Sequence, residues 1–252
     1  MSFRIVIPAR FASVRLPGKA LREIAGRPLL AHVHDRARES GADEIVVATD
    51  DPRIELAARN FGAAVVMTSA AHASGTDRIA AVVERLGWPD DTLVVNLQGD
   101  EPLMPPAVIG QVASVLESAT GAALATLCAP LESLAEFLDP NVVKVVTDAR
   151  GAALYFSRAP LPWPRDRIGS DGWPYSCAHA RRHIGVYAYR VASLRRLAAL
   201  PQCELEQVEC LEQLRAIYNG LLIQVAMAGE IPAPGVDTDE DLARVKALLE
   251  NA

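Results

Sequence analysis

The sequence predicts an α/β protein with a Rossmann-like, mostly parallel sheet that is covered by helices on both faces. Two observations support this class. Short apolar runs without charged residues alternate with amphipathic helical stretches from the start of the chain. Each run is also no longer than a typical strand and is bounded by turn residues such as proline, glycine or aspartate. Uninterrupted apolar runs of this length are typical of strands that are buried on both faces, as in a parallel sheet.

Strands and helices are expected in strict alternation over the first half of the chain. The local signals are specific: Pro28 suits the first turn of a helix, Gly41 stops that helix, and Asp51 is placed to cap the next one. The expected strands cover residues 4–7, 45–49, 63–67 and 93–97. The expected helices cover residues 28–40, 52–62 and 77–86, and a further helix opens at 105. Ligands of such sheets bind beyond the carboxyl ends of the strands.

The second half of the chain is expected to be richer in extended structure. Extended segments are expected at 121–127, 142–147, 152–157 and 183–190, with a hairpin turn at 148–151 and a long loop at 159–181. The remaining expected elements are a helix at 204–218, a strand at 221–227 and a helix at 238–249. Thr238 and Asp241 have the spacing of a capping box for that last helix. We therefore expect one domain, residues 1–252, with roughly 128–190 as a β-rich excursion.

Composition and charge narrow the class of protein. Half of the residues are hydrophobic and 22% are charged, which is ordinary for a globular chain of 252 residues. The net charge of -6 argues against a general nucleic-acid binder. No apolar run approaches the roughly 18 residues of a membrane span, and the N-terminus has no signal pattern, so a cytoplasmic protein is expected. The four cysteines show no C-x-x-C pair, which favours buried or incidental thiols.

The loop after the first strand carries positive charge without a neighbouring acid. Arg10, Arg15 and Lys19 all precede Glu23, the first acidic residue of the chain. Three cations beside Gly18, which permits close approach of the backbone, suit a polyphosphate. The loop is not a P-loop, because it lacks the first glycine and the final hydroxyl of that motif. A solvated basic loop is the alternative that the sequence leaves open.

Two aspartates are candidate ligands of a divalent cation. Asp100 follows the buried strand at 93–97, and a carboxylate at the carboxyl end of a buried strand is well placed to hold Mg²⁺ beside a substrate phosphate. Asp237 is a candidate second ligand from far along the chain. A turn aspartate and a helix cap are the respective alternatives. For Asp50 and Asp51 the capping interpretation is favoured over the metal.

Other polar groups allow both a structural and a functional interpretation. The turn of Ser74, Gly75 and Thr76 opens the helix at 77–86, and its N–H groups could bind a base edge or a phosphate, or Ser74 could simply cap the helix. On the expected helix 204–218, Glu209 and Gln213 would share a face, and a solvated face is the default there.

At this point the motifs resemble a known family, the 3-deoxy-D-manno-octulosonate (KDO) cytidylyltransferases, or CMP-KDO synthetases, of Gram-negative bacteria. The matching segments occur in family order: IPARFASVRLPGK at 7–19, ATD at 48–50, SGTDR at 74–78, NLQGDEP at 96–102, NVVKVV at 141–146, ALYFSRA at 153–159, RHIGVYAYR at 182–190, LEQVECLEQLR at 205–215 and GVDT at 235–238. The related CMP-sialate synthetases typically read RGGSK in the first loop. Phe11 stands where tyrosine is common in the family, and nothing is carried over to the loop 159–181.

The resemblance implies a nucleotide-diphospho-sugar transferase fold and the reaction of CTP with KDO to give CMP-KDO and pyrophosphate. The KDO hydroxyl would attack the α-phosphorus of CTP in line, which activates KDO for lipopolysaccharide synthesis. The catalytic residues would be Arg10, Arg15, Lys19 and Asp100. The nucleotide would lie against Ala9, Arg10, Lys19, Ser74, Gly75, Arg78 and Gln98. The sugar would lie against Arg158, His183, Tyr187, Glu212 and Gln213. Asp100 and Asp237 would hold Mg²⁺, and family members are homodimers that use the extended middle segment.

Three alternatives remain at this point. The nearest is a cytidylyltransferase for another acidic sugar, such as sialate or an 8-amino analogue of KDO. A glycosyltransferase on a similar sheet, with Asp100 as its metal ligand, would consume a nucleotide-sugar and release no pyrophosphate. A catalytically silent binding protein is disfavoured by the intact set Arg10, Lys19, Asp100 and Asp237.

Overall fold

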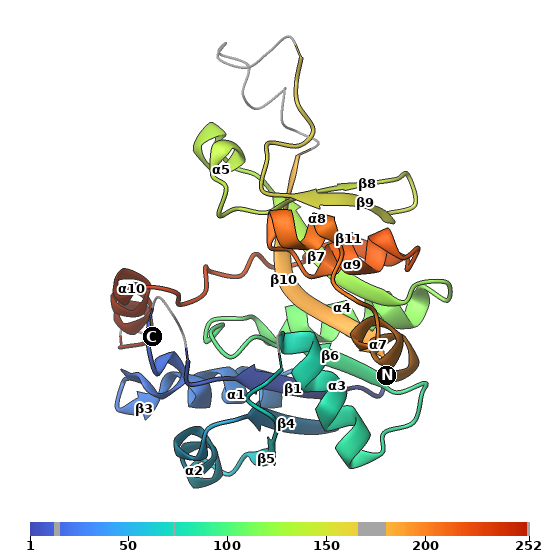
Figure 1. The fold of residues 1–252 in the computed structure, drawn as a ribbon. Coiled ribbons are helices and arrows are strands. Elements are labelled where there is room, and N and C mark those ends of the chain that lie inside the picture. Colours follow the sequence, from blue (N-terminus) through green and yellow to red (C-terminus); the bar gives the residue numbers. More distant parts are fainter. Residues whose placement is uncertain (13–15, 73, 166–179, 251–252) are drawn as a thin grey trace.

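Nine strands form one mixed sheet in the part of the chain that the computed structural model describes, which is residues 1–12, 16–72, 74–165 and 180–250. The strands are β1 (Arg4–Ala9), β4 (Glu44–Thr49), β5 (Ala64–Met67), β6 (Leu93–Asn96), β7 (Leu124–Pro130), β8 (Lys144–Thr147), β9 (Ala153–Ser157), β10 (Arg181–Arg190) and β11 (Ile223–Met227). Their order is β11-β7-β10-β6-β1-β4-β5, with β8 paired to both β10 and β9 (Figure 1).

The sheet is mostly parallel around β1. The strand pairs β1–β4, β1–β6, β4–β5 and β7–β11 are parallel, whereas β10 runs antiparallel to β6, β7 and β8. The predicted α/β class with a mostly parallel sheet is therefore confirmed. Because β1 and β6 are parallel neighbours, the loops after Ala9 and after Asn96 leave the sheet at the same edge.

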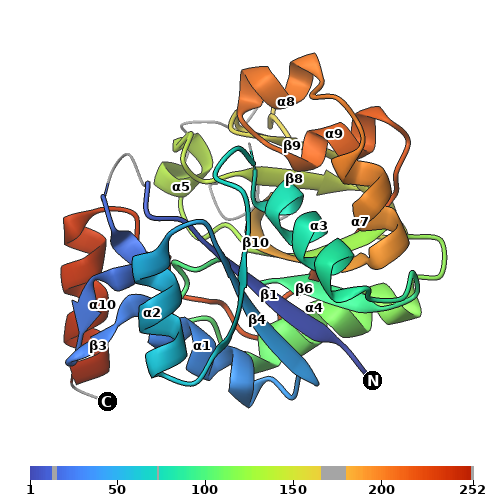
Figure 2. The same ribbon diagram turned by 60° about the horizontal axis from the view of Figure 1, so that its bottom comes forward.

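Helices cover both faces of this sheet. They are α1 (Leu29–Glu39), α2 (Pro52–Asn60), α3 (Gly75–Leu86), α4 (Pro106–Ser118), α5 (Leu134–Leu138), α7 (Val191–Ala198), α8 (Glu204–Glu209), α9 (Gln213–Tyr218) and α10 (Asp239–Glu250). Side chains of β1 alternate between two cores: Ile5 and Ile7 pack with α1 and α4, and Val6 packs with α3 and α7. Figure 2 shows α3 and α7 on one side of the central strands, with α1 and α4 on the other.

The predicted helix caps are present. The Asp51 carboxylate accepts a hydrogen bond from the Arg53 N–H at the start of α2, and the Ser74 hydroxyl accepts one from the Asp77 N–H in α3. Before α10, the Asp241 N–H donates to the Thr238 hydroxyl and the Thr238 N–H donates to the Asp241 carboxylate, which completes the capping box.

The prediction of one helix over 204–218 is wrong. The segment forms two short helices, α8 and α9, because Cys210 adopts the left-handed conformation with φ 52° and ends α8. No glycine or proline marks this break in the sequence. The break turns Leu211 into the core and starts a new helix axis at Gln213, so Glu209 and Gln213 do not share a helix face.

Several short elements were not expected from the sequence. They are the 3-10 helix η1 (Lys19–Leu21), the small hairpin β2 (Glu23–Ile24) and β3 (Arg27–Pro28), and the helices α5 and α7. The apolar stripe of α7 consists of Val191, Leu194 and Leu197. Because it follows directly on the apolar run of β10, the change from strand to helix periodicity is hard to see in the sequence. Figure 1 shows β8, β9 and α5 together above the main body of the sheet, and the division into a core and an excursion stays a prediction.

The long loop expected at 159–181 lies mostly outside the described residues, since 166–179 are not among them. Among the described residues, no helix combines the length and the apolar character that crossing a membrane requires.

Candidate active site

The loops that follow β1 and β6 form a cavity of about 380 Å³ at the carboxyl ends of the strands. Arg10 and Lys19 come from the first loop, and Gln98 and Asp100 come from the second. Asp237 closes the cavity from the segment before α10. Gly18 has a φ of 67° and makes the sharp turn at which η1 begins. Lys19, the next residue, then lines the cavity. Four residues predicted for phosphate or metal binding thus meet at one place.

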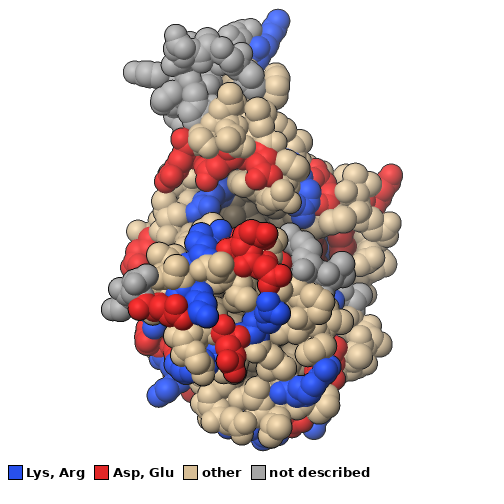
Figure 3. All heavy atoms as spheres, turned by 90° about the vertical axis from the view of Figure 1, so that its left-hand side faces the viewer, with Lys and Arg blue, Asp and Glu red and all other residues tan. Residues whose placement is uncertain are grey.

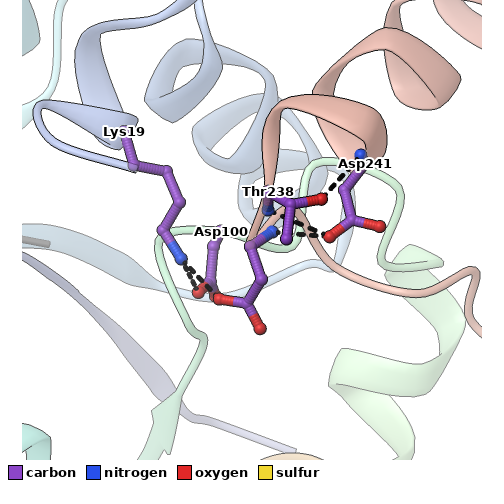
Figure 4. Close-up of polar contacts among 5 residues, drawn as sticks. Lys19, Asp100, Thr238 and Asp241 are labelled. Carbon is purple, nitrogen blue, oxygen red and sulfur yellow. Dashed lines mark hydrogen bonds and ion pairs between the residues drawn. The ribbon is translucent and has the colours of Figure 1, made fainter. Parts of the chain in front are cut away.

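The Lys19 ammonium bridges the two predicted metal ligands. Its Nζ lies 2.5 Å from Oδ2 of Asp100 and 3.1 Å from Oδ1 of Asp237. Figure 4 shows the Lys19 side chain extending to Asp100 beside the Thr238–Asp241 cap. Burial disfavours the ammonium, but the charges and hydrogen bonds of both carboxylates outweigh this effect and raise the pKa of Lys19.

Backbone contacts hold the two aspartates together although they are far apart in the sequence. The Val236 N–H donates to the Asp100 carbonyl at 2.9 Å. The Asp237 N–H donates to the Asp241 carboxylate at 3.1 Å, so the cap of α10 also fixes Asp237. Gly235 fits closely here, since a Cβ on it would lie 3.1 Å from the Asp100 carbonyl oxygen. The proximity of the carboxylates is therefore built into the chain and does not depend on Lys19 alone.

Glu101 is a partly buried neighbour of this site to which the sequence assigns no role. Burial, together with the negative charges of Asp100 and Asp237, raises the pKa of Glu101 to about 8. The side chain packs against Gly235, where a Cβ would lie 3.1 Å from Glu101 Oε1. In the sequence, a glutamate directly before Pro102 is typical of a surface turn. The Glu101 side chain is shielded from solvent because the segment 235–237 packs against it.

The face of the molecule around α10 is mixed in charge. Figure 3 shows Lys and Arg side chains interleaved with Asp and Glu across it. Individual pairs include Arg22 with Asp239 at 2.6 Å and Arg244 with Asp241 at 2.8 Å. These pairs are partly exposed and contribute little to stability.

The residues predicted around the nucleotide line a smaller cavity of about 90 Å³. Its lining includes Ala9, Arg10, Ser74, Gly75, Arg78 and Gln98, all of which were predicted from the sequence. The Arg78 guanidinium is buried and donates to Thr68 Oγ1 at 2.5 Å and to Asp50 Oδ2 at 3.1 Å. Arg78 thus ties α3 to the ends of β4 and β5. The capping role expected for Asp50 is wrong: Asp50 pairs with Arg78, and Asp51 is the residue that caps α2.

The residues predicted around the sugar line a third cavity, of about 250 Å³. His183, Tyr187, Glu212 and Gln213 are all part of its lining. Two buried atoms there, the Tyr187 hydroxyl and Glu212 Oε1, have no partner with hydrogen-bond geometry among the described residues; the Thr126 side chain approaches the Tyr187 hydroxyl but donates its own proton to a backbone carbonyl. Buried polar atoms without partners are rare, and in a cavity they are typical of a site whose ligand supplies the missing bonds. Burial raises the pKa of Glu212 and of Tyr187.

His183 is neutral and has a defined tautomer. Desolvation of the partly buried ring lowers its pKa to about 3. Its Nε2 lies 2.9 Å from the Thr126 hydroxyl, which itself lies 2.8 Å from the Val186 carbonyl and 3.0 Å from the Ile184 carbonyl. Because the hydroxyl has one proton and donates it to a carbonyl, His183 Nε2–H must donate to Thr126. The ring is therefore fixed in the cavity wall rather than poised to exchange protons.

The three cavities adjoin one another at Gln98. Gln98 lines all three. We call the cavity of Lys19 and Asp100 the phosphate-like cavity, the cavity of Ser74 the nucleotide cavity and the cavity of His183 the sugar-like cavity, after the ligand part that each would bind. Thr76, expected in a nucleotide-binding turn, and Asn96, to which the sequence assigned no role, also line the sugar-like cavity. A signal for Asn96 exists: it is the one amide in the apolar run of β6, and it is 3% exposed.

One predicted residue does not line the cavities, and another lies outside the described residues. Arg158 does not line the sugar-like cavity; its guanidinium donates to the carbonyls of Glu209 at 2.8 Å and Pro140 at 2.9 Å. The Glu209 carboxylate in turn accepts from the Ser157 hydroxyl and the Arg158 N–H. Arg15 lies outside the described residues.

Comparison with known proteins gives a consistent family. The family model for cytidylyltransferases matches residues 4–224. The chain is 56% identical over 249 residues to the 3-deoxy-manno-octulosonate cytidylyltransferase of Thioalkalivibrio sulfidiphilus, with 99% of both chains covered. It is 52% identical over 251 residues to the enzyme of the same name from Yersinia enterocolitica, with 100% of both covered.

Solved structures agree at the level of the fold. A CMP:2-keto-3-deoxy-manno-octonic acid synthetase in complex with CTP superposes with a TM-score of 0.89 at 41% identity, covering 99% of this chain and 98% of that one. A cytidylyltransferase from Leptospira borgpetersenii superposes with a TM-score of 0.63 at 17% identity, covering 100% of this chain and 87% of that one. The second likeness concerns the fold alone.

Proposed function

This chain belongs to the 3-deoxy-manno-octulosonate cytidylyltransferase family, and from that premise we propose that it transfers CMP from CTP to KDO and releases pyrophosphate. The observation that carries the proposal is that the three cavities adjoin one another at Gln98. The charged phosphate-like cavity suits a triphosphate, and the sugar-like cavity, with its unsatisfied buried polar atoms, suits a sugar. The reaction requires that the α-phosphate of CTP and the sugar hydroxyl meet, and the place where the cavities adjoin, at Gln98, would allow this.

The chemistry follows from positioning and charge. The anomeric hydroxyl oxygen of KDO attacks the α-phosphorus of CTP, a new P–O bond forms, and the bond to the bridging oxygen of the β-phosphate breaks. Pyrophosphate leaves, and the hydroxyl proton passes to solvent. Arg10 and Lys19 stabilise the triphosphate and the departing pyrophosphate, since both side chains line the phosphate-like cavity. Arg15 would add a third cation from the same loop.

The residues present fit a bound Mg²⁺. Carboxylate oxygens of Asp100 and Asp237 converge on a single cation, the Lys19 ammonium, at 2.5 and 3.1 Å. Oxygen ligands of this kind are those that Mg²⁺ prefers beside substrate phosphates. When bound there, Mg²⁺ would supply charge stabilisation at the α-phosphate and lower the pKa of the attacking hydroxyl. Asp100 and Asp237 would hold it, and the cap of α10 would orient Asp237.

The sugar-like cavity supplies hydrogen bonds for a polyhydroxylated acid. The Tyr187 hydroxyl donates to a sugar oxygen, and Glu212 Oε1 accepts from a sugar hydroxyl, which satisfies both buried atoms. Gln213 adds an amide, and His183 presents its neutral ring. Arg158, which was expected to face the KDO carboxylate, would have to leave the Pro140 and Glu209 carbonyls to do so.

A direct test is competition among acidic sugars. The protein receives CTP and Mg²⁺ with equal amounts of KDO, its 8-amino analogue and sialate, and mass spectrometry identifies the CMP-sugar that forms. The names of the relatives favour KDO over these alternatives. CMP-KDO is therefore the expected main product. Preference for either other sugar would reassign the substrate, and consumption of a nucleotide-sugar without pyrophosphate would favour a glycosyltransferase.

The cellular setting is also part of the proposal. We propose a cytoplasmic homodimer that supplies activated KDO for lipopolysaccharide synthesis and binds neither nucleic acid nor membrane. Three large apolar side chains of the middle segment, Leu138, Leu154 and Trp163, are exposed, which supports a contact through this segment. Sedimentation velocity of the wild-type chain and of Leu154→Arg tests this. A dimer that the substitution weakens is expected, and a wild-type monomer would contradict the assignment.

A further inference from the structure

Lys19 occupies the position between two carboxylates that the proposed function assigns to a metal. Its Nζ is within 3.1 Å of an oxygen of each aspartate. The ammonium is largely shielded, with its side chain 15% exposed, whereas the Asp100 and Asp237 side chains are 30% and 46% exposed. An ammonium and a divalent cation cannot share this position, because like charges at such a distance repel strongly.

We propose that Lys19 is the resident cation of the nucleotide-free site, and that it must leave Asp100 and Asp237 before Mg²⁺ binds them. The triphosphate is what draws Lys19 away, so nucleotide and metal bind in a mutually reinforcing way. The inference rests on the proposed function, because it assumes that Asp100 and Asp237 are the metal ligands.

The construction of the site supports such an exchange. The backbone contact between Val236 and Asp100 keeps the carboxylates close, so without a cation two negative charges would face each other. The four-carbon stem of lysine carries a compact charge on flexible bonds, which suits a group that moves between two partners. Arg10 and Lys19 line the same cavity. Phosphate groups bound beside Arg10 would therefore lie close to Lys19 and would attract its ammonium group.

Metal binding to the nucleotide-free protein tests the exchange without any catalysis. Isothermal titration with Mg²⁺ compares the wild-type chain with Lys19→Met, which keeps the stem and removes the charge. Coupling energies between neighbouring sites predict a Mg²⁺ affinity about tenfold higher for Lys19→Met than for wild type. Equal or weaker affinity in Lys19→Met, or no detectable binding to it, would overturn the inference.

Arg22→Met is the matched control, because Arg22 follows η1 directly and pairs with Asp239 at 2.6 Å. It removes one positive charge from the same face without touching Asp100 or Asp237. Its Mg²⁺ affinity should stay within about twofold of wild type, as expected for a partly screened surface charge. A gain as large as that of Lys19→Met would mean that general charge, and not displacement, sets the affinity, and would overturn the inference.

The scarcity of lysine allows the exchange to be observed in the wild-type chain. Only Lys19, Lys144 and Lys246 are present, so lysine labelled with ¹³C and ¹⁵N at its end gives three side-chain signals. Lys144 is buried and donates to the carbonyls of Asp139 and Val142, so it serves as an internal reference. Saturating Mg²⁺, and separately CTP without metal, should each shift the Lys19 signal. An unmoved Lys19 signal in either titration would contradict the proposal.

The double variant Lys19→Met/Asp100→Asn separates this inference from the proposed function. Loss of Mg²⁺ binding is expected, because one of the two carboxylates is gone. If binding survives in the double variant, the metal lies elsewhere and the metal assignment itself fails, together with the inference. If binding is lost here but Lys19→Met binds no better than wild type, the inference alone fails.

Discussion

At the scale of single residues, His183 shows how burial decides a chemical role. The sequence places a histidine beside two arginines, Arg181 and Arg182, which invites a charged interpretation. The structure places the ring, partly buried, in the wall of the cavity, where desolvation lowers its pKa to about 3 and Nε2–H donates to Thr126. The folded state therefore favours the neutral form of His183, and we do not expect this side chain to exchange protons during catalysis.

The pH dependence of stability tests this assignment. A folded pKa below the unfolded value of about 6.5 means that the stabilising effect of neutral His183 is complete above pH 6.5 and is lost as the pH falls toward 3. Between pH 6.5 and pH 5 the wild type should lose about 2 kcal/mol more unfolding free energy than His183→Gln. Urea unfolding at both pH values measures this. If the unfolding free energies of the two proteins fall equally with pH, protonation of His183 does not destabilise the fold, and the assignment is wrong.

Gly99 carries a second prediction at this scale, because it lets the loop of Asp100 approach the end of β1. A Cβ on Gly99 would lie 2.8 Å from the Pro8 carbonyl oxygen, and this backbone atom cannot move aside. We expect Gly99→Ala to lose about 1–3 kcal/mol of stability and to raise the KM for CTP. Gly121→Ala is the control, since nothing lies within 4 Å of its Cβ position. Comparable stability and KM for the two variants would contradict the close-approach argument.

At the scale of elements, the break between α8 and α9 positions the sugar-like cavity. The buried Arg215 guanidinium donates to both carboxylate oxygens of Glu206, at 2.8 and 2.5 Å, and so fixes one short helix on the other. Cys210 provides the turn, and Glu212 and Gln213 then face the cavity. A single straight helix would carry these two side chains on a different axis.

Breaking the ion pair should affect both folding and sugar binding. Glu206→Gln leaves a buried guanidinium without its countercharge, which should cost about 3–5 kcal/mol of unfolding free energy. Any protein that remains folded should have a raised KM for KDO and a KM for CTP that is nearly unchanged. Glu204→Gln, an exposed position on the same helix, is the matched control. If both variants behave alike in urea unfolding and in KM, the pair does not position the cavity.

The sequence predicts most elements but not this break, for physical reasons. Strong local signals mark the predicted boundaries: Asp51, Ser74 and the Thr238–Asp241 box all make the expected hydrogen bonds. Cys210 has no such signal, because its left-handed conformation is imposed by the packing of Leu211 and the Glu206–Arg215 pair. Tertiary contacts overrode a helical pattern that was locally consistent.

At the scale of the whole molecule, the fold brings together groups that are far apart in the chain. The parallel pairing of β1 with β6 places Lys19 and Asp100 at one edge of the sheet, as the strand pattern predicts. The approach of Asp237 depends on the path of residues 228–238 across that edge. The sequence alone made Asp237 a candidate second ligand but left the helix cap as an open alternative, because it does not contain this path. The burial of Glu101 and the fixed ring of His183 come from packing, which single-sequence patterns do not contain.

One reaction tests the proposed function most directly. Pyrophosphate release is measured for purified protein with CTP, KDO and Mg²⁺, with controls that lack the sugar or the metal. We predict one pyrophosphate per CMP-KDO, no release without KDO, and a rate for Asp100→Asn that is lower by at least about a hundredfold. Release of pyrophosphate without any sugar, or a wild-type protein that releases none with KDO, would contradict the proposed function.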